Sequence, residues 1–410
     1  MSLKPLLKSA LISLFVISPS VFAGAAFNGV NAQIGAGFAN LGSENYWSDY
    51  GSYKYGKKGT LGNISLGYSH KFENQFNIAT NLFYTFGSDK SGGRPDNYNT
   101  VYKTKNIWGL VLEPGYYFSD SSLGFLKLGY ARTSSEHVDS GSKSDFGNIN
   151  GFLYGLGFKQ MIQDHLYIGA EAYQIDFSKS DITQNNWWPG NDITNKPSVT
   201  YGGIMLGYNF GSDNDKYDSN KNSSPGRFNG VNAQFGLGFA AKSSRSDYLE
   251  EFGRVDLSDK GVLSNLSLGY SHNLNGRFNI AGNIFYAFGN NDAGQWQTEY
   301  YRWKIKDIWG VSLEPGYYFN DNGLGYLKLG YANTSSEDIE PSNNADYGNT
   351  GGFLYGAGFK QFLTDNIYVG IETFQINFSK SKTVVSQDGS NTTNNKPAVT
   401  YGGLMIGYKF

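Results

Sequence analysis

Apolar residues alternate with small or polar residues along many segments of this chain. In the segment 75–87, Phe76, Ile78, Leu82 and Tyr84 share one face, and Asn and Thr residues occupy much of the other. A period of two is the signature of a β-strand with one apolar face. The alternation therefore predicts a chain built of strands, although Phe83 interrupts the polar face of this one.

The sequence also repeats itself. Three segments recur about two hundred residues further on: FNGVNAQ at 27–33 and 228–234, LEPGYYF at 112–118 and 313–319, and YGGIMLGYNF at 201–210 against YGGLMIGYKF at 401–410. The repeat covers nearly the whole chain after its first residues, so it indicates an internal duplication. We predict copies at 24–210 and 228–410, joined at 211–227 by a polar segment without apolar periodicity that is typical of a flexible tether.

Each copy contains eight alternating segments. In the first copy they are 28–40, 61–70, 75–87, 105–118, 122–134, 150–162, 164–178 and 198–210. Tight connections alternate with the long polar ones at 41–60, 88–104, 135–149 and 179–197. Strands of about ten residues with this alternation of connections are typical of outer-membrane barrels. A soluble β-sandwich shows the same period of two, but it requires neither an even strand count nor the asymmetry of the connections.

The first 23 residues have the pattern of a secretory signal. Lys4 and Lys8 precede a short apolar run, and Val21-Phe22-Ala23 has the form of a cleavage site. The run is too short to span a hydrocarbon core of about 30 Å. We therefore expect residues 1–23 to be a signal peptide and the mature chain to be exported to the outer membrane of a Gram-negative bacterium.

Each copy resembles the OmpA-like and opacity-type family of small eight-stranded outer-membrane barrels. The terminal Phe410, with Tyr408 and Ile406 on the same face, looks like the assembly signal of that family, and Phe210 repeats this ending inside the chain. The resemblance implies periplasmic termini, short periplasmic turns and long surface loops. It also implies contacts with outer-membrane lipid and, during biogenesis, with periplasmic chaperones and the barrel-assembly machinery. The duplication departs from the family, in which single barrels are usual.

Charged residues on the inward face of the predicted strands form a balanced set. The first copy has Glu113, Lys127, Lys159 and Glu171, and the second has Glu314, Lys328, Lys360 and Glu372. All lie near the short turns, and Glu113 should face Lys127 across a hairpin. Buried charges need partners, and an eight-stranded barrel is just wide enough for its side chains to fill. We predict a salt-bridged plug, with an ion gate or selectivity ring as the alternative.

The long connections contain aromatic residues that differ between the copies. Trp187 and Trp188 lie in 179–197, and Trp296 and Trp303 lie in 289–304. Exposed aromatics could contact an external ligand. The alternative is that they belong to an interfacial girdle or pack within the loops.

Composition excludes several classes of function. The chain has 410 residues, no Cys, four His and a net charge of −2, with 54 Gly and 16% aromatic residues. It therefore has no thiolate metal site, no cysteine nucleophile and no basic field for nucleic acid. No set of base, nucleophile and orienting group is visible. We expect no enzymatic activity and no cofactor.

Two arrangements remain open at this stage. Two tandem eight-stranded barrels agree with the closing aromatic strand and charge set of each copy, whereas one sixteen-stranded barrel would enclose a water-filled lumen. We favour the tandem arrangement and a structural, surface-exposed or adhesion-type role. The alternative is a porin-like channel, formed by one large barrel or by two narrow pores.

Overall fold

The computed structural model describes residues 26–48, 50–95, 99–184, 191–210, 226–248, 253–274, 276–297, 301–339, 344–385 and 392–410. The predicted signal peptide and nearly all of the predicted tether lie outside these residues. Within them, no helix is long and apolar enough to cross a membrane.

The described part of the first copy consists of antiparallel strands. Its eight long strands are β1 (Gly29–Trp47), β2 (Gly51–Lys71), β3 (Phe76–Gly87), β5 (Thr100–Ser119), β6 (Ser122–Asp139), β7 (Ser142–Met161), β8 (Leu166–Phe177) and β10 (Asn191–Asn209), and its short strands are β4 (Lys90–Arg94) and β9 (Ser180–Gln184).

The second copy repeats this order. Its long strands are β11 (Gly230–Tyr248), β12 (Gly253–Asn273), β13 (Phe278–Gly289), β15 (Tyr301–Asn320), β16 (Gly323–Ile339), β17 (Asn344–Phe362), β18 (Ile367–Phe378) and β20 (Thr392–Lys409), and its short strands are β14 (Asp292–Trp296) and β19 (Val384–Val385).

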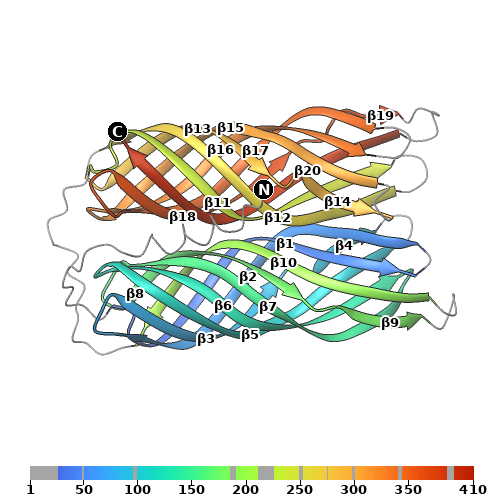
Figure 1. Ribbon diagram of the computed structural model, residues 1–410, viewed down its shortest axis with the longest axis horizontal. Coiled ribbons are helices and arrows are strands. Elements are labelled where there is room, and N and C mark those ends of the chain that lie inside the picture. Colours follow the sequence, from blue (N-terminus) through green and yellow to red (C-terminus); the bar gives the residue numbers. More distant parts are fainter. Residues whose placement is uncertain are drawn as a thin grey trace, which may run out of the picture.

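Strand pairing returns to its starting point within each copy. In the first, Ile34 of β1 is opposite Ile64 of β2 and Leu206 of β10. In the second, Phe235 of β11 is opposite Leu266 of β12 and Ile406 of β20. The strands of each copy therefore curve into a closed cylinder, and the two cylinders lie side by side in Figure 1. Closure leaves neither set of strands with an unpaired edge along this length.

The period of two places apolar residues on the outside of each cylinder. Ile34, Leu66 and Leu110 are 53%, 58% and 55% exposed, whereas the polar Gln33 and Asn63 are buried inside. The interrupting Phe83 points inward, as its sequence position requires, and is buried. This band of outward apolar side chains, here called the apolar band, is the reverse of a soluble protein's surface.

The strands run further than the sequence predicted at one end. The connection 41–60, expected to be a long loop, is β1 as far as Trp47 and β2 from Gly51 onward. The alternation continues there with its polarity reversed: Leu41 and Tyr55 are buried inside, while Glu44 and Lys54 point outward. The prediction identified strands by apolar residues on their outer face, so it missed the parts of the strands that extend beyond the apolar band. We call this the long-loop end, and the opposite one the short-turn end.

The two cylinders contact each other through corresponding positions of the repeat. The rings of Phe38 and Tyr355 lie 5.1 Å apart, and those of Tyr154 and Phe239, which are their counterparts, lie 5.4 Å apart. Phe158 meets its own counterpart Phe359 at 5.7 Å. The contact, here called the seam, thus has approximate two-fold symmetry.

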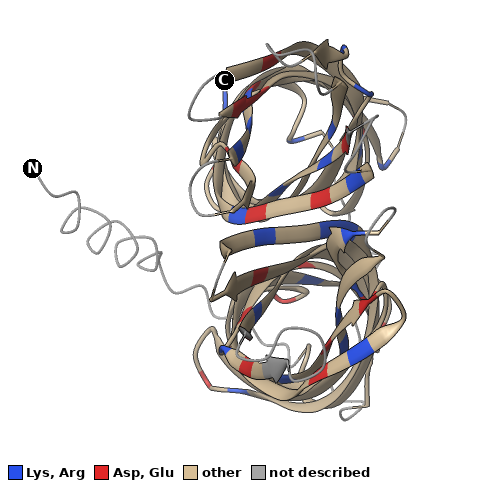
Figure 2. Cartoon of the chain, turned by 90° about the vertical axis from the view of Figure 1, so that its right-hand side faces the viewer, with Lys and Arg blue, Asp and Glu red and all other residues tan. Residues whose placement is uncertain are grey.

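At the long-loop end the copies also exchange backbone and side-chain contacts. Tyr55 of β2 pairs with Leu257 of β12, and Lys54 forms a 2.8 Å ion pair with Asp259. The guanidinium of Arg94 lies 4.8 Å from the centre of a Trp296 ring. Viewed from this end, both rims carry acidic and basic residues (Figure 2). The long-loop ends therefore form one continuous platform.

Because the chain lacks Cys, the seam can be tested by cross-linking without background. In a Phe38→Cys, Tyr355→Cys variant with a protease site added within 211–227, a short bis-maleimide should keep the halves in one band after cleavage. Pairing Phe38→Cys with Leu82→Cys, which lies on β3 of the same barrel, is the control and should yield two bands. Separation of the halves in both variants would contradict the seam.

Candidate functional site

The four inward charges of the first copy meet inside its barrel, toward the short-turn end. Glu113 comes from β5, Lys127 from β6, Lys159 from β7 and Glu171 from β8. Each side chain points into the barrel because its position continues the inward phase of its strand. All four residues are almost completely buried, with relative exposures of 1% to 4%.

These groups form an alternating row of charges. The Lys127 Nζ lies 2.6 Å from Glu171 Oε2 and 3.6 Å from Glu113 Oε1, and the Lys159 Nζ lies 2.9 Å from Glu113 Oε2. The order is therefore Glu171, Lys127, Glu113, Lys159, so that each inner charge has an opposite charge on either side. Such pairing offsets much of the cost of removing the four ions from water.

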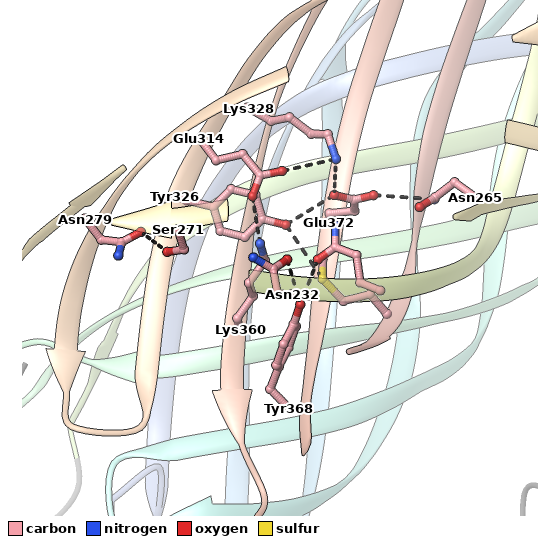
Figure 3. Close-up of polar contacts among 12 residues, drawn as sticks. Asn232, Asn265, Ser271, Asn279, Glu314, Tyr326, Lys328, Lys360, Tyr368 and Glu372 are labelled. Carbon is pink, nitrogen blue, oxygen red and sulfur yellow. Dashed lines mark hydrogen bonds and ion pairs between the residues drawn. The ribbon is translucent and has the colours of Figure 1, made fainter. Parts of the chain in front are cut away.

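The second copy contains the same row. Lys328 lies 2.8 Å from Glu372 and 3.3 Å from Glu314, and Lys360 lies 2.7 Å from Glu314. Figure 3 shows these groups converging within the second barrel. The geometry is thus present twice in one chain.

Polar side chains form hydrogen bonds with the carboxylate at the end of each row, Glu171 in the first copy and Glu372 in the second. The Asn63 amide donates to Glu171 Oε1 at 3.1 Å, and its counterpart Asn265 lies 3.4 Å from Glu372. In the second copy the Tyr326 hydroxyl also donates to Glu372 at 3.2 Å. The first copy has Phe125 at that position, which has no hydroxyl, so its row lacks this hydrogen bond.

Apolar clusters lie on both sides of each row along the barrel axis. Toward the short turns, Phe27, Tyr117 and Met205 belong to a buried cluster of the first copy, and Phe228, Tyr318 and Met405 to that of the second. Toward the long-loop end, Leu61, Phe83 and Leu153 are buried, as are Leu263 and Phe285. An ion following the axis would have to pass both the charged row and an apolar layer.

Phe27 and Phe228 close the short-turn mouths. Each lies just before the first strand of its copy and is 3% or 5% exposed. Phe27 packs 5.5 Å from the Tyr167 ring, and the backbone N–H of Phe228 donates to the Tyr318 hydroxyl at 3.2 Å. These residues were not predicted from the sequence; their signal is an aromatic residue at the start of both copies, immediately before the alternating pattern begins.

The four tryptophans predicted to lie in the long connections are found in different environments. Trp187 and Trp188 lie outside the described residues. Trp296 is half-buried and packs against Arg94 at the junction of the copies. Trp303 is completely buried on β15, which agrees with the alternative that it packs within the protein and not with contact to an external ligand. Its strand extends into the region expected to be a loop, and its side chain falls on the inward phase.

The C-terminal residues lie on the outer face of the second barrel. Ile406, Tyr408 and Phe410 are 42%, 45% and 70% exposed and continue its apolar band. Their role as an assembly signal remains a prediction.

A buried histidine inside the long-loop end was also missed. His137 is fully buried on β6, its ring stacks 4.6 Å from Tyr102 and lies 5.8 Å from Trp47, and neither ring nitrogen has a hydrogen-bond partner. Burial lowers the pKa of His137 to about 4, against a smaller opposing effect of Asp139. The described residues contain no cluster of three or more His, Asp and Glu that could hold a metal ion.

Comparison with known proteins places the chain in a class. Residues 9–210 match a family model described as an outer membrane protein beta-barrel domain, and this match ends where the first copy ends. Comparison with curated proteins gave no match.

Among solved structures, the chain is similar to a FadL homologue of Pseudomonas aeruginosa at 12% identity, over 93% of this chain and 90% of that one, with a TM-score of 0.32. It is similar to the toluene transporter TodX of P. putida at 10% identity, over 95% and 93%, with a TM-score of 0.30. It is similar to Ail, the attachment invasion locus protein of Yersinia pestis, at 15% identity, over 43% and 99%, with a TM-score of 0.25.

At these TM-scores the similarities decide neither how the strands close nor what the protein binds. The family match, the all-antiparallel strands and the apolar band together define the class. The chain is an outer-membrane β-barrel protein.

We predict that Lys127→Met will strongly destabilise the protein. It leaves Glu171 buried without a cation, which costs about 3–5 kcal/mol, and the loss should appear in guanidinium unfolding followed by heat-modifiable gel mobility. Adding Glu171→Gln should recover much of the loss. The matched control is Lys103→Met, which affects a partly exposed pair with Glu136 and should cost at most about 1 kcal/mol. Equal effects of the two lysine variants would contradict the buried row.

The long-loop end should become less stable in acid. His137 binds its proton at a lower pH in the folded than in the unfolded chain, so stability is lost as pH falls from about 6.5 toward 4. The shift corresponds to a loss of about 3 kcal/mol. Limited proteolysis of this end between neutral pH and pH 4 should show the loss, and His137→Phe should remove it. His272→Gln, at an exposed position, should behave like wild type; an unchanged profile in His137→Phe would refute the assignment.

Proposed function

We propose that the mature chain forms two tandem, separately closed eight-stranded barrels in the outer membrane. Register supports this arrangement. A sixteen-stranded barrel requires β10 to pair with β11 and β20 with β1, whereas β10 pairs with β1 and β20 with β11. Because the hydrocarbon core offers no partner for free backbone groups, a sheet that crosses it has to close.

In this proposal the short-turn end faces the periplasm. The described chain enters the first barrel at this end, next to Phe27, and leaves the second there, where the Phe410 N–H donates to Val231 at 3.0 Å. The strands extend beyond the apolar band only at the other end, where polar outward residues such as Glu44 and Lys54 suit water. The shared platform then lies on the cell surface.

The proposed role is non-enzymatic and structural, with the platform exposed to the medium as in an adhesion-type protein. The observation that carries it is the filled lumen of each barrel, where a charged row lies between apolar clusters. A channel for ions or polar solutes needs a continuous polar, hydrated path. With the lumen occupied, the outward surface of the platform is the part that can meet a partner.

Planar-bilayer conductance of the refolded mature chain tests this proposal. Wild type should be silent or open rarely, because both rows are intact. A Glu113→Ala, Glu314→Ala variant removes the carboxylate shared by two lysines in each row and should open more often. Large, steady unitary steps in wild type would overturn the proposal in favour of a porin-like channel.

A matched control keeps the conductance test specific. Glu136 lies at the long-loop end of the first barrel, where it pairs with Lys103 and Lys105 at 3.1 and 2.6 Å. Glu136→Ala removes a carboxylate without touching either row, so it should leave conductance at the wild-type level. If the control and the double variant opened equally often, general destabilisation of the barrel, and not loss of the charged row, would explain the ion conductance.

A further inference from the structure

An apolar crevice lies between the two barrels near the short-turn end. Its volume is about 330 Å³. Ile168 and Ile204 of the first barrel form one wall, and Phe278, Tyr317 and Phe319 of the second form the other, with Ala357 among the small residues between them. None of the residues that line it carries a charge.

The crevice is part of the surface that meets lipid. Ile204, Phe278 and Tyr317 are 44%, 58% and 37% exposed and belong to the apolar band. Phe278 begins β13 next to a short turn, so the crevice lies in the part of the band close to the short-turn end. It is therefore open to the leaflet on that side.

Several residues that line the crevice differ between the copies, and the largest difference in side-chain volume is at Ala357. Ala357 of the second copy corresponds to Leu156 of the first. Leu156 packs with Phe118 and Ile168 against the buried core of the seam, which includes Phe158 and Phe359. The smaller Ala357 side chain cannot fill the equivalent volume, although its neighbours on β13, β15 and β16 are nearly the same in both copies.

The apolar lining of the crevice determines which molecules can occupy it. An apolar cavity does not hold ordered water, which needs two to four polar partners. An empty space would deprive the surrounding side chains of dispersion contacts. The hydrocarbon chains of the bilayer are in immediate contact with it, and a chain that enters it meets Ile, Phe, Tyr and Ala side chains.

We propose that the crevice binds one acyl chain of a phospholipid from the leaflet at the short-turn end. The proposal rests on the tandem-barrel arrangement, because both barrels supply its walls. The bound chain completes the seam where Ala357 leaves it incomplete, so that lipid is a component of the contact between the barrels.

Native mass spectrometry of the full mature chain, extracted in mild detergent from vesicles of phosphatidylethanolamine and phosphatidylglycerol, tests the site. Wild type should retain one phospholipid per chain through detergent washes that strip other lipid. Ala357→Leu introduces the residue that the first copy already accommodates, and it should lower the retained fraction at least about fivefold by filling the space. Thr80→Leu, on the exposed face of β3, should retain lipid as wild type does.

Equal retention by wild type and Ala357→Leu would overturn the proposal. So would a retained species whose mass is that of a free fatty acid. A phospholipid with a photoreactive group at the end of its acyl chain gives a second readout. It should label peptides of β16 and β17 in wild type and label them much less in Ala357→Leu.

Failure of the acyl-chain site can be distinguished from failure of the tandem-barrel arrangement by a second experiment. Cross-linking between Phe38→Cys and Tyr355→Cys reports on the seam independently of lipid. If the cross-link forms and Ala357→Leu retains lipid normally, only the acyl-chain site is wrong. If the cross-link fails, the arrangement on which the site rests is itself wrong. Unchanged heat-modifiable mobility of Ala357→Leu shows that it is folded.

Discussion

The backbone hydrogen bond is the constraint on which the rest of this structure depends. In a hydrocarbon environment each N–H and C=O needs a protein partner, so strands can cross only as a closed set. Closure of eight strands leaves a narrow interior, and that interior has to be filled by side chains. The buried rows of Glu and Lys, and the apolar clusters that flank them, follow from this geometry. The outward apolar band follows from the same alternation.

The seam shows how two closed cylinders can still associate. Neither has a free edge along the apolar band, so side chains make the contact there, with aromatic pairs related by the repeat. Beyond the band, β3 ends at Gly87 opposite Leu61 of β2, and Tyr55 further along β2 pairs with Leu257 of β12 in the other copy. The barrels therefore contact each other through side-chain packing within the band and also through a strand-to-strand pair beyond it.

Much of the fold and of the charged rows could be predicted because both depend on period-two alternation. The inward phase of Glu113, Lys127, Lys159 and Glu171 is readable from their apolar neighbours. The long-loop end was missed because its alternation has the opposite polarity, which made strands look like loops and made the buried Trp303 look exposed. The closing Phe27 was missed because it precedes the periodic pattern, although it is the first residue of a segment that recurs in both copies. The crevice depends on packing between copies, and only the difference between Ala357 and Leu156 hints at it.

Because both halves of the seam belong to one polypeptide, the pairing of the barrels is independent of how much protein the membrane contains. Two separate chains would have to meet by diffusion, and their association would weaken as they were diluted by lipid. A covalent link sets a fixed effective concentration, of millimolar order for short flexible links. The aromatic pairs of the seam and the contacts at the long-loop end then do not have to hold two separate chains together. The stoichiometry of the platform at the long-loop end, one copy of each kind, is thereby set at synthesis and does not depend on the expression level.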